Sequence, residues 1–247
     1  MKAIIALKYL SKILRAKDGA ERDRFEFLEK IGKYLYPEYK FSEFGRTFLQ
    51  DKEFIALYER FEGVRNYHSL DRKYTIDQLA QMAVNIPGDT AECGAYKGAS
   101  SYFICRRTKG ANKHHHVFDS FEGLSSPGER DGQYWTAGDL SATEEEIRGN
   151  LAEFDFVRYH KGWIPERFSE VSDGRFSLVH LDVDLYQPTL DSLAFFYERM
   201  SRGGVIVCDD DGFISCPGAR RAMDEFFKDK DEPVVRLPTG QAMVIKV

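Results

Sequence analysis

Two acidic clusters follow apolar segments that have the composition of β-strands. The first contains Asp182 and Asp184 within LDVDLY, and the second is the run Asp209, Asp210 and Asp211. In a parallel sheet the carboxyl ends of neighbouring strands meet at one edge, where ligands bind. Clustered carboxylates repel one another, whereas a hard divalent cation binds them through their oxygens. The spacing therefore predicts a divalent cation, with magnesium as the natural choice, on Asp182, Asp209 and Asp210.

Asp184 and Asp211 have a simpler expected role. Single aspartates at strand ends usually cap the next helix or pair with a basic residue. Arg220 and Arg221 follow closely in the sequence. We therefore expect Asp184 and Asp211 to be caps or ion-pair partners and not metal ligands.

Two other motifs carry side chains suited to a site. The run His114–His116 has metal-binding side chains, but adjacent residues of an extended segment point to opposite faces, so we expect a solvated loop. Tyr134 and Trp135 lie in a glycine-rich stretch. They suit either the lining of an acceptor pocket or a cover over the sheet, and the sequence leaves both open.

A glycine-containing turn follows the first predicted strand. Gly94 permits a tight turn and Gly98 close contact between the next helix and the strand, while the helix N-terminus offers free N–H groups. The spacing differs from GxGxxG, which serves a dinucleotide pyrophosphate. Asp119 ends the second predicted strand, where an acidic side chain can accept hydrogen bonds from an adenosine ribose. This combination suits S-adenosylmethionine as well as NAD.

The order of elements predicts helices first and repeated βα units afterwards. In residues 1–83 apolar residues recur at helical spacing, with helices expected at Phe25–Tyr36, Lys52–Phe61 and Thr75–Val84. Strands are expected at Thr90–Cys93, His116–Asp119, Phe156–His160, Ser177–Asp182, Gly204–Cys208, Val234–Leu237 and Ala242–Val247. Intervening helices are expected at Ser100–Arg107, Ser141–Glu153, Thr189–Ser201 and Gly218–Lys228. Residues 84–247 therefore form an α/β domain with a mainly parallel sheet.

The connection between the last two strands sets their direction. Only Pro238–Gln241 separates them, which is too short for a crossover helix. We therefore expect an antiparallel C-terminal hairpin.

The composition indicates a globular chain with a small or neutral ligand. Of the 247 residues, 43% are hydrophobic and 30% charged, which suffices for a core. The net charge of −5 argues against a nucleic-acid partner, because phosphate recognition depends on clustered lysine and arginine. We expect a small-molecule or glycan acceptor. The four cysteines lack CxxC spacing, which indicates a reducing compartment and no structural zinc.

The first residues predict a basic amphipathic helix. Ala3, Leu7, Leu10 and Leu14 recur at helical spacing, with lysines and an arginine between and after them. No apolar stretch approaches the roughly 20 residues needed to cross a bilayer. We expect a cytoplasmic protein whose first helix packs on its own domain or on a second subunit. Contact with an anionic membrane is the alternative.

Five motifs occur in a fixed order from Pro87 to the C-terminus. They are GDTAECG at 88–94, DSFEG at 119–123, KGW at 161–163, LDVDLY at 181–186, and the stretch from Gly203-Gly204 to Asp209-Asp210. The set resembles the macrocin O-methyltransferase (TylF-like) family. The resemblance implies a class I methyltransferase (Rossmann-like) fold with an antiparallel final strand. It also implies methyl transfer from S-adenosylmethionine to sugar hydroxyls of natural products, with magnesium.

The resemblance assigns roles to individual residues. Asp182, Asp209 and Asp210 would be metal ligands, and Asp182 would also take the acceptor proton. The cofactor-binding positions would be Glu92, Gly94, Ala95, Tyr96, Ser100, Asp119, Ser120, Phe121 and Trp163. Of these, Glu92 and Gly94 would contact the methionine part, Asp119 the ribose, and Ser120, Phe121 and Trp163 the adenine surroundings.

The same resemblance leaves the acceptor open. Many relatives have an aromatic residue just after the metal pair, where this chain has Asp211-Gly212-Phe213. Residues 1–83 match only loosely, and in the family this region helps to build the acceptor pocket and the oligomer. Phe41, Phe44, Phe48 and Tyr67 offer aromatic surface for either purpose. We therefore expect residues 1–83 to form a cap and to take part in a homo-oligomer.

Two other functions fit parts of the pattern. Asp182-Val183-Asp184 looks like the DxD motif of a metal-dependent nucleotide-sugar glycosyltransferase. A non-catalytic cofactor-binding protein with a surviving fold is the second alternative. Binding of UDP-sugars would favour the first, and a lack of turnover the second.

Overall fold

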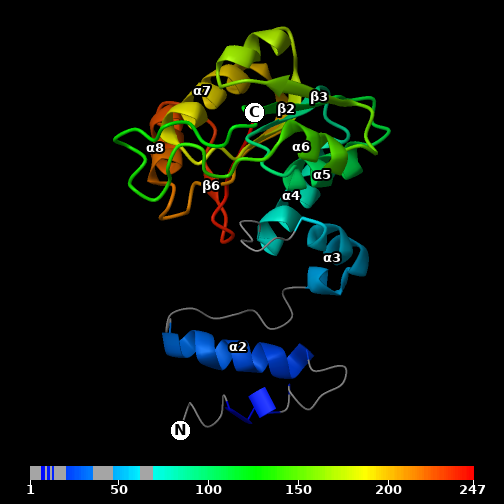
Figure 1. The fold of residues 1–247 in the computed structure, drawn as a ribbon, viewed down its shortest axis with the longest axis vertical. Coiled ribbons are helices and arrows are strands. Elements are labelled where there is room, and N and C mark those ends of the chain that lie inside the picture. Colours follow the sequence, from blue (N-terminus) through cyan, green and yellow to red (C-terminus); the bar gives the residue numbers. More distant parts are fainter. Residues whose placement is uncertain (1–6, 9, 12, 14–20, 36–46, 62–68) are drawn as a thin grey trace. The chain divides into compact units, whose positions relative to one another are not determined.

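The computed structural model describes residues 7, 8, 10, 11, 13, 21–35, 47–61 and 69–247. Contacts between Cα atoms divide the chain into two compact units, Met1–Ala56 and Leu57–Val247. The second unit holds the β-sheet (Figure 1).

Apart from Asp51, the described residues of the first unit are helical. α2 spans Glu21–Leu35, the 3-10 helix η1 spans Thr47–Gln50, and α3, which continues into the second unit, spans Lys52–Glu59. The helices predicted at Phe25–Tyr36 and Lys52–Phe61 are thus confirmed with shifted ends. The basic helix predicted at the N-terminus lies largely outside the described residues. None of the helices that are described is long and apolar enough to cross a membrane.

A mainly parallel sheet forms the centre of the second unit. Its strands are β1 (Asp89–Cys93), β2 (His115–Asp119), β3 (Val157–Lys161), β4 (Phe176–Leu181), β5 (Met200–Cys208), β6 (Val235–Arg236) and β7 (Ala242–Ile245). Their order is β3-β2-β1-β4-β5-β7-β6. β1 to β5 are parallel, whereas β7 runs antiparallel to both β5 and β6. The predicted α/β domain and its closing hairpin are confirmed.

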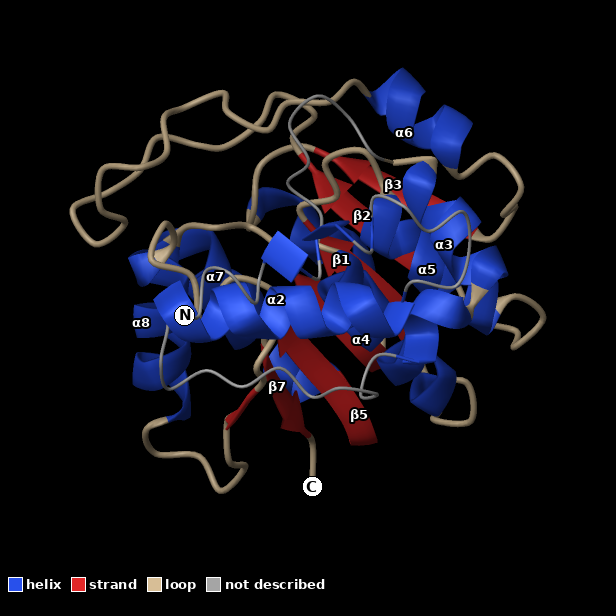
Figure 2. Cartoon of the chain, turned by 90° about the horizontal axis from the view of Figure 1, so that it is seen from below, coloured by secondary structure: helices blue, strands red, loops and turns tan. Residues whose placement is uncertain are grey.

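Helices cover both faces of this sheet (Figure 2). They are α4 (Leu70–Ala83), α5 (Ala99–Thr108), α6 (Glu144–Asn150), η2 (Glu166–Val171), α7 (Tyr186–Phe196), η3 (Tyr197–Arg199) and α8 (Pro217–Phe227). Successive side chains of a strand point to opposite faces, so neighbouring residues of β4 enter different cores. Leu178 packs with Ile76 of α4, and Val179 packs with Leu193 of α7 and Met223 of α8. Every residue of β4 is buried, as suits a central parallel strand.

α4 belongs to the second unit and not to the N-terminal region in which the sequence placed it. The predicted boundary lay between residues 83 and 84, whereas the contacts divide the chain after Ala56. The fully buried carboxylate of Asp77 explains how α4 is fixed. It accepts hydrogen bonds from Nε of Arg106 at 2.6 Å and from Nε of Arg107 at 2.8 Å, both on α5. This ion pairing ties the helix before β1 to the helix after it.

Two local predictions need correction. The helix predicted at Ser141–Glu153 is only α6, which starts where Oγ1 of Thr143 accepts the Glu146 N–H at 3.1 Å. The run His114–His116 is not a solvated loop, because β2 begins at His115. His115 is fully buried and hydrogen-bonds Thr90 and Ser101, while His116 contacts His160 from the opposite face. The predicted alternation of His115 and His116 between the two faces is confirmed, but both faces of β2 are covered, so the run is not solvated.

We predict that Asp77→Ala lowers the free energy of unfolding by about 2–4 kcal/mol, because it leaves Arg106 and Arg107 without their shared carboxylate. Urea denaturation monitored by circular dichroism measures this change. Asp173→Ala is the matched control, since Asp173 is exposed. Equal stability of the two variants would contradict the anchoring role of Asp77.

Candidate active site

A cavity of about 490 Å³ opens at the carboxyl ends of the parallel strands. The turn after β1, the end of β2 and the acidic segments after β4 and β5 contribute to its wall, together with the start of α4. The two motifs that the sequence placed at this edge, the glycine turn and the acidic clusters, therefore meet in one cavity.

The turn after β1 requires glycine at position 94. Gly94 has φ of +77°, and a Cβ there would lie 2.0 Å from the carbonyl oxygen of Asp182. The Gly94 N–H donates to the Phe118 carbonyl at 2.9 Å, and the Asp182 N–H donates to the Cys93 carbonyl at 2.9 Å. These bonds extend the sheet beyond its strands and bring Asp182 against the turn.

Asp119 holds the same turn from the end of β2. Its Oδ2 accepts the Ala95 N–H and its Oδ1 accepts the Phe121 N–H, each at 2.7 Å. Burial raises the pKa of Asp119, although the backbone hydrogen bonds oppose the shift. The carboxylate lies in the cavity wall, where it can face a ligand.

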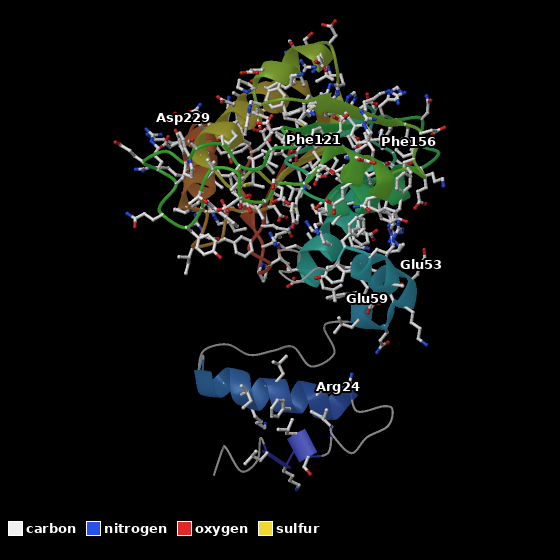
Figure 3. All side chains as sticks on the ribbon, in the orientation of Figure 1. Arg24, Glu53, Glu59, Phe121, Phe156 and Asp229 are labelled. Atoms are coloured by element: carbon white, nitrogen blue, oxygen red, sulfur yellow. The ribbon has the colours of Figure 1, made fainter. Side chains whose placement is uncertain are left out.

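Most predicted cofactor positions line the cavity. Gly94, Ala95, Tyr96, Ser100, Asp119, Ser120 and Trp163 all do so. Glu92 and Phe121 do not, and Phe121, which is labelled in Figure 3, is a buried residue of the second unit. The cavity wall therefore includes seven of the predicted positions and excludes these two.

Glu92 instead belongs to a buried polar network behind the wall. Its Oε1 accepts from Nδ1 of His180 at 2.8 Å, and its Oε2 accepts from the Ser101 hydroxyl. Burial alone would raise the pKa of Glu92, but the hydrogen bond and charge of His180 outweigh burial and hold that pKa below its ordinary value. Burial lowers the pKa of His180, yet hydrogen bonds to Asp209 and Glu92 raise it to about 9. His180 is therefore a cation that bridges two carboxylates.

The acidic side chains after β4 and β5 converge as predicted. Oxygens of Asp182, Asp209 and Asp210 lie within 4.8 Å of one another, in a group of residues able to hold a metal ion. The Asp209 N–H donates to the Leu181 carbonyl at 2.8 Å, which extends the pairing of β4 with β5 to this point. Burial and the charges of Asp184 and Asp182 raise the pKa of Asp210 well above its usual range. Negative charge at this edge is thus incompletely neutralised.

Asp184 differs from its predicted role, whereas Asp211 matches it. Asp211 pairs with Arg236 at 3.0 Å and with Arg220 at 3.7 Å. Asp184 neither caps a helix nor pairs with Arg220 or Arg221; it lies in the cavity wall and accepts from the Cys216 thiol at 3.2 Å. Burial and the charge of Asp182 raise the pKa of Asp184 to about 7.

Two cations on α4 also reach the acidic group, and no sequence motif marked them. Arg72 donates from Nη1 to Oδ2 of Asp209. Nζ of Lys73 lies 3.7 Å from Oδ2 of Asp182 and donates to Oγ of Ser100 at 2.5 Å. Both residues line the cavity. The sequence does not predict this contact, because Arg72 and Asp209 are far apart in the chain and meet only through the packing of α4 on the sheet.

Aromatic side chains form the outer part of the cavity. Tyr134 and Trp135 line it, with ring centroids 4.8 Å apart, and Trp135 also packs against the core. Trp135 donates from Nε1 to Sγ of Cys216 at 3.3 Å. The buried Asp131, another residue that the sequence did not single out, accepts the Tyr186 N–H at 2.6 Å and so fixes this loop on the start of α7. An apolar ring or sugar face can stack in this part of the cavity.

Comparison with known proteins agrees with this geometry. The model of the family described as Macrocin-O-methyltransferase (TylF) matches residues 63–238. A demethyldecarbamoylnovobiocin O-methyltransferase of Streptomyces niveus is 31% identical over 164 residues, which cover 58% of this chain and 59% of that protein. A Streptomyces olivaceus 4'-O-methyltransferase of a rhamnosyl tetracenomycin is 31% identical over 152 residues, covering 56% and 58%. The chain thus spans about three fifths of the length of these relatives.

Solved structures show the same fold. The O-methyltransferase NovP is 27% identical, with a TM-score of 0.59 over 74% of this chain and 83% of NovP. The calicheamicin methyltransferase CalS11 has a TM-score of 0.61 over 98% of this chain and 91% of its own, at 15% identity, a likeness of fold alone. The class I methyltransferase fold is confirmed. The family match covers well over half of the sequence, and the chain belongs to the macrocin O-methyltransferase (TylF) family.

Proposed function

We propose that this protein is an S-adenosylmethionine-dependent O-methyltransferase that acts on a hydroxyl of a sugar or glycosylated natural product. The observation that carries the proposal is the meeting of the Gly94 turn, Asp119 and the acidic group in one cavity. Family membership supports the methyl-transfer reaction, and the names of the relatives point to glycosylated acceptors. The glycosyltransferase alternative loses support, because the DxD motif belongs to this methyltransferase cavity.

The cofactor would occupy the side of the cavity formed by β1 and β2. Asp119 would accept hydrogen bonds from the ribose hydroxyls, since its oxygens are oriented by the backbone of Ala95 and Phe121. Gly94, Ala95, Tyr96 and Ser100 would surround the methionine part. Ser120 and Trp163 would lie near the adenine. Glu92 would act through the network behind the wall.

The acidic residues fit a divalent cation. Three carboxylates from two adjacent strand ends supply the hard oxygen ligands that magnesium prefers, and the raised pKa of Asp210 indicates that negative charge accumulates there. A bound divalent cation would lower the pKa of the acceptor hydroxyl. Asp182, whose side chain is 27% exposed at the cavity, would collect the proton that this hydroxyl loses. Close alignment of the hydroxyl with the methyl donor supplies the rest of the rate enhancement.

The N-terminal region would complete the acceptor side. Arg72 and Lys73 line the cavity but lie on α4, which belongs to the second unit, so the proposed cap concerns the residues before it. In the first unit, Phe48 and Phe54 form an edge-to-face aromatic pair with ring centroids 6.5 Å apart. The other aromatic residues proposed for a cap, Phe41, Phe44 and Tyr67, lie outside the described residues. We propose that the residues before α3 cover the acceptor and contribute to a homo-oligomer.

We predict that Asp119→Ala weakens S-adenosylmethionine binding by about 1–3 kcal/mol, the value of a charge-assisted pair of hydrogen bonds. Isothermal titration calorimetry measures the affinity. Asp119→Asn keeps one acceptor oxygen, so its affinity for S-adenosylmethionine should fall less than that of Asp119→Ala. Because Asp119 also holds the Gly94 turn, thermal unfolding of each variant is recorded alongside. Unchanged affinity in a folded Asp119→Ala variant would refute the ribose assignment.

A second prediction concerns the metal. Asp210→Asn, or removal of divalent cations by chelation, should abolish methyl transfer and leave S-adenosylmethionine binding largely intact, because the metal serves the acceptor. The assay follows label from S-adenosylmethionine into a panel of glycosides, with and without chelator. Asp211→Asn is the matched control, since its side chain pairs with Arg236 outside the ligand group. Full activity after thorough chelation would eliminate the metal requirement.

A third prediction tests the cap. A chain that begins at Asp51, whose Oδ1 accepts the Phe54 N–H at 2.9 Å, keeps the start of α3. It should fold and bind S-adenosylmethionine, yet lose acceptor turnover and change its oligomeric state. Calorimetry, the glycoside assay and sedimentation together measure these properties. A fully active truncated monomer would show that residues 1–50 form no cap.

A further inference from the structure

Arg72 is held firmly against the acidic group. Its Nη1 donates to Oδ2 of Asp209, and its Nε donates to Oγ of Ser69 at 3.1 Å. The guanidinium lies over the ring of Phe213, with its carbon 4.8 Å from the ring centroid. Only 12% of the side chain is exposed. A cation is thus built into the group of carboxylates that would hold a metal.

Both oxygens of Asp209 already accept hydrogen bonds. Oδ1 accepts from Nε2 of His180 at 3.1 Å and from Nε2 of Gln241 at 2.7 Å, and Oδ2 accepts from Arg72. Two bonds use the lone pairs of Oδ1, so Oδ2 is the oxygen with capacity for another partner. A metal ion bound to Asp209 must therefore either share Oδ2 with the Arg72 guanidinium or replace that guanidinium.

Electrostatics favours replacement over sharing. Two cations on one carboxylate oxygen would lie a few ångströms apart in a buried site, where like charges repel far more strongly than in water. Lys73 presents a weaker conflict, because its Nζ is 3.7 Å from Asp182 and is hydrogen-bonded to Ser100. Among the described cations, Arg72 is the one that donates to Oδ2 of Asp209, whereas His180 donates to Oδ1.

We propose that Arg72 takes the place of a divalent cation on Asp209 in the metal-free protein, and that it leaves Oδ2 of Asp209 when the metal binds. The inference rests on the metal site of the proposed function. Arg72 then has two effects. It neutralises the buried carboxylate of Asp209 when no metal is present, and it lowers the affinity of the site for the metal.

The test is a titration with Mn²⁺, followed by electron paramagnetic resonance, of the full-length protein and of Arg72→Gln. The variant should bind Mn²⁺ at least about ten times more tightly than the unmodified protein, because one competing charge is gone. It should also unfold at a lower temperature without metal and regain more stability when Mn²⁺ is added. Arg220→Gln is the matched control, since Arg220 pairs with Asp211 outside the ligand group, and its Mn²⁺ affinity should not change.

A second variant guards against misfolding of Arg72→Gln. Arg72→Lys keeps the charge but loses the planar contact with Phe213, so its Mn²⁺ affinity should lie between those of the unmodified protein and Arg72→Gln. Mn²⁺ affinity in folded Arg72 variants that equals or falls below that of the unmodified protein would overturn the proposal. It would make Arg72 a permanent partner of Asp209.

The outcomes separate this inference from the proposed function. S-adenosylmethionine binding and methyl transfer with and without chelator are measured on the same samples. If the unmodified protein needs Mn²⁺ or Mg²⁺ for transfer while Arg72→Gln gains no affinity, the exchange at Asp209 alone is refuted. If no variant binds Mn²⁺ and transfer proceeds in chelator, the metal site and the inference both fail, whereas the methyltransferase assignment stands.

Discussion

Repulsion among buried carboxylates is the constraint on which the arrangement of the second unit depends. Asp182, Asp184, Asp209 and Asp210 meet where β4 and β5 end, and the charges of Asp184, Asp182 and Asp209 add to burial in raising the pKa of Asp210. Such a group is tolerated only if cations approach it. His180 from within the sheet, and Arg72 and Lys73 from α4, supply the positive charge. The position of α4 is therefore an electrostatic requirement as well as a means of covering the sheet.

The anchoring of α4 connects stability to the site. Asp77 of α4 binds Arg106 and Arg107 of α5. One turn earlier on α4, Lys73 donates to Ser100 at the start of α5. α5 follows the Gly94 turn, which Asp119 holds in place through the Ala95 N–H. Helix, turn and acidic group are thus connected, which would fix the spacing between the proposed cofactor side and the proposed metal side. Such preorganisation is what alignment of a methyl donor with a hydroxyl demands.

The site was predictable from the sequence to the extent that its residues follow strands directly. Asp119, Asp182, Asp209 and Asp210 could be placed at one edge, because the period of the apolar residues identifies each strand and parallel strands end together. Asp184 was misassigned because the sequence does not show that Asp131 already accepts the Tyr186 N–H at the start of α7. Glu92 lies within β1 and not after it, and its side chain points behind the cavity wall toward His180.

Local patterns in the sequence determined the order of helices and strands, the closing hairpin, the glycine turn and the two acidic clusters, because each depends on residues that are near one another in the chain. Only the tertiary structure decided which cations meet those acids. Arg72 and Asp209 are brought together by the docking of α4 on the sheet, and Asp131 reaches α7 through a long loop. Contacts of this kind arise from the three-dimensional path of the backbone, which the period and spacing of a single sequence do not encode.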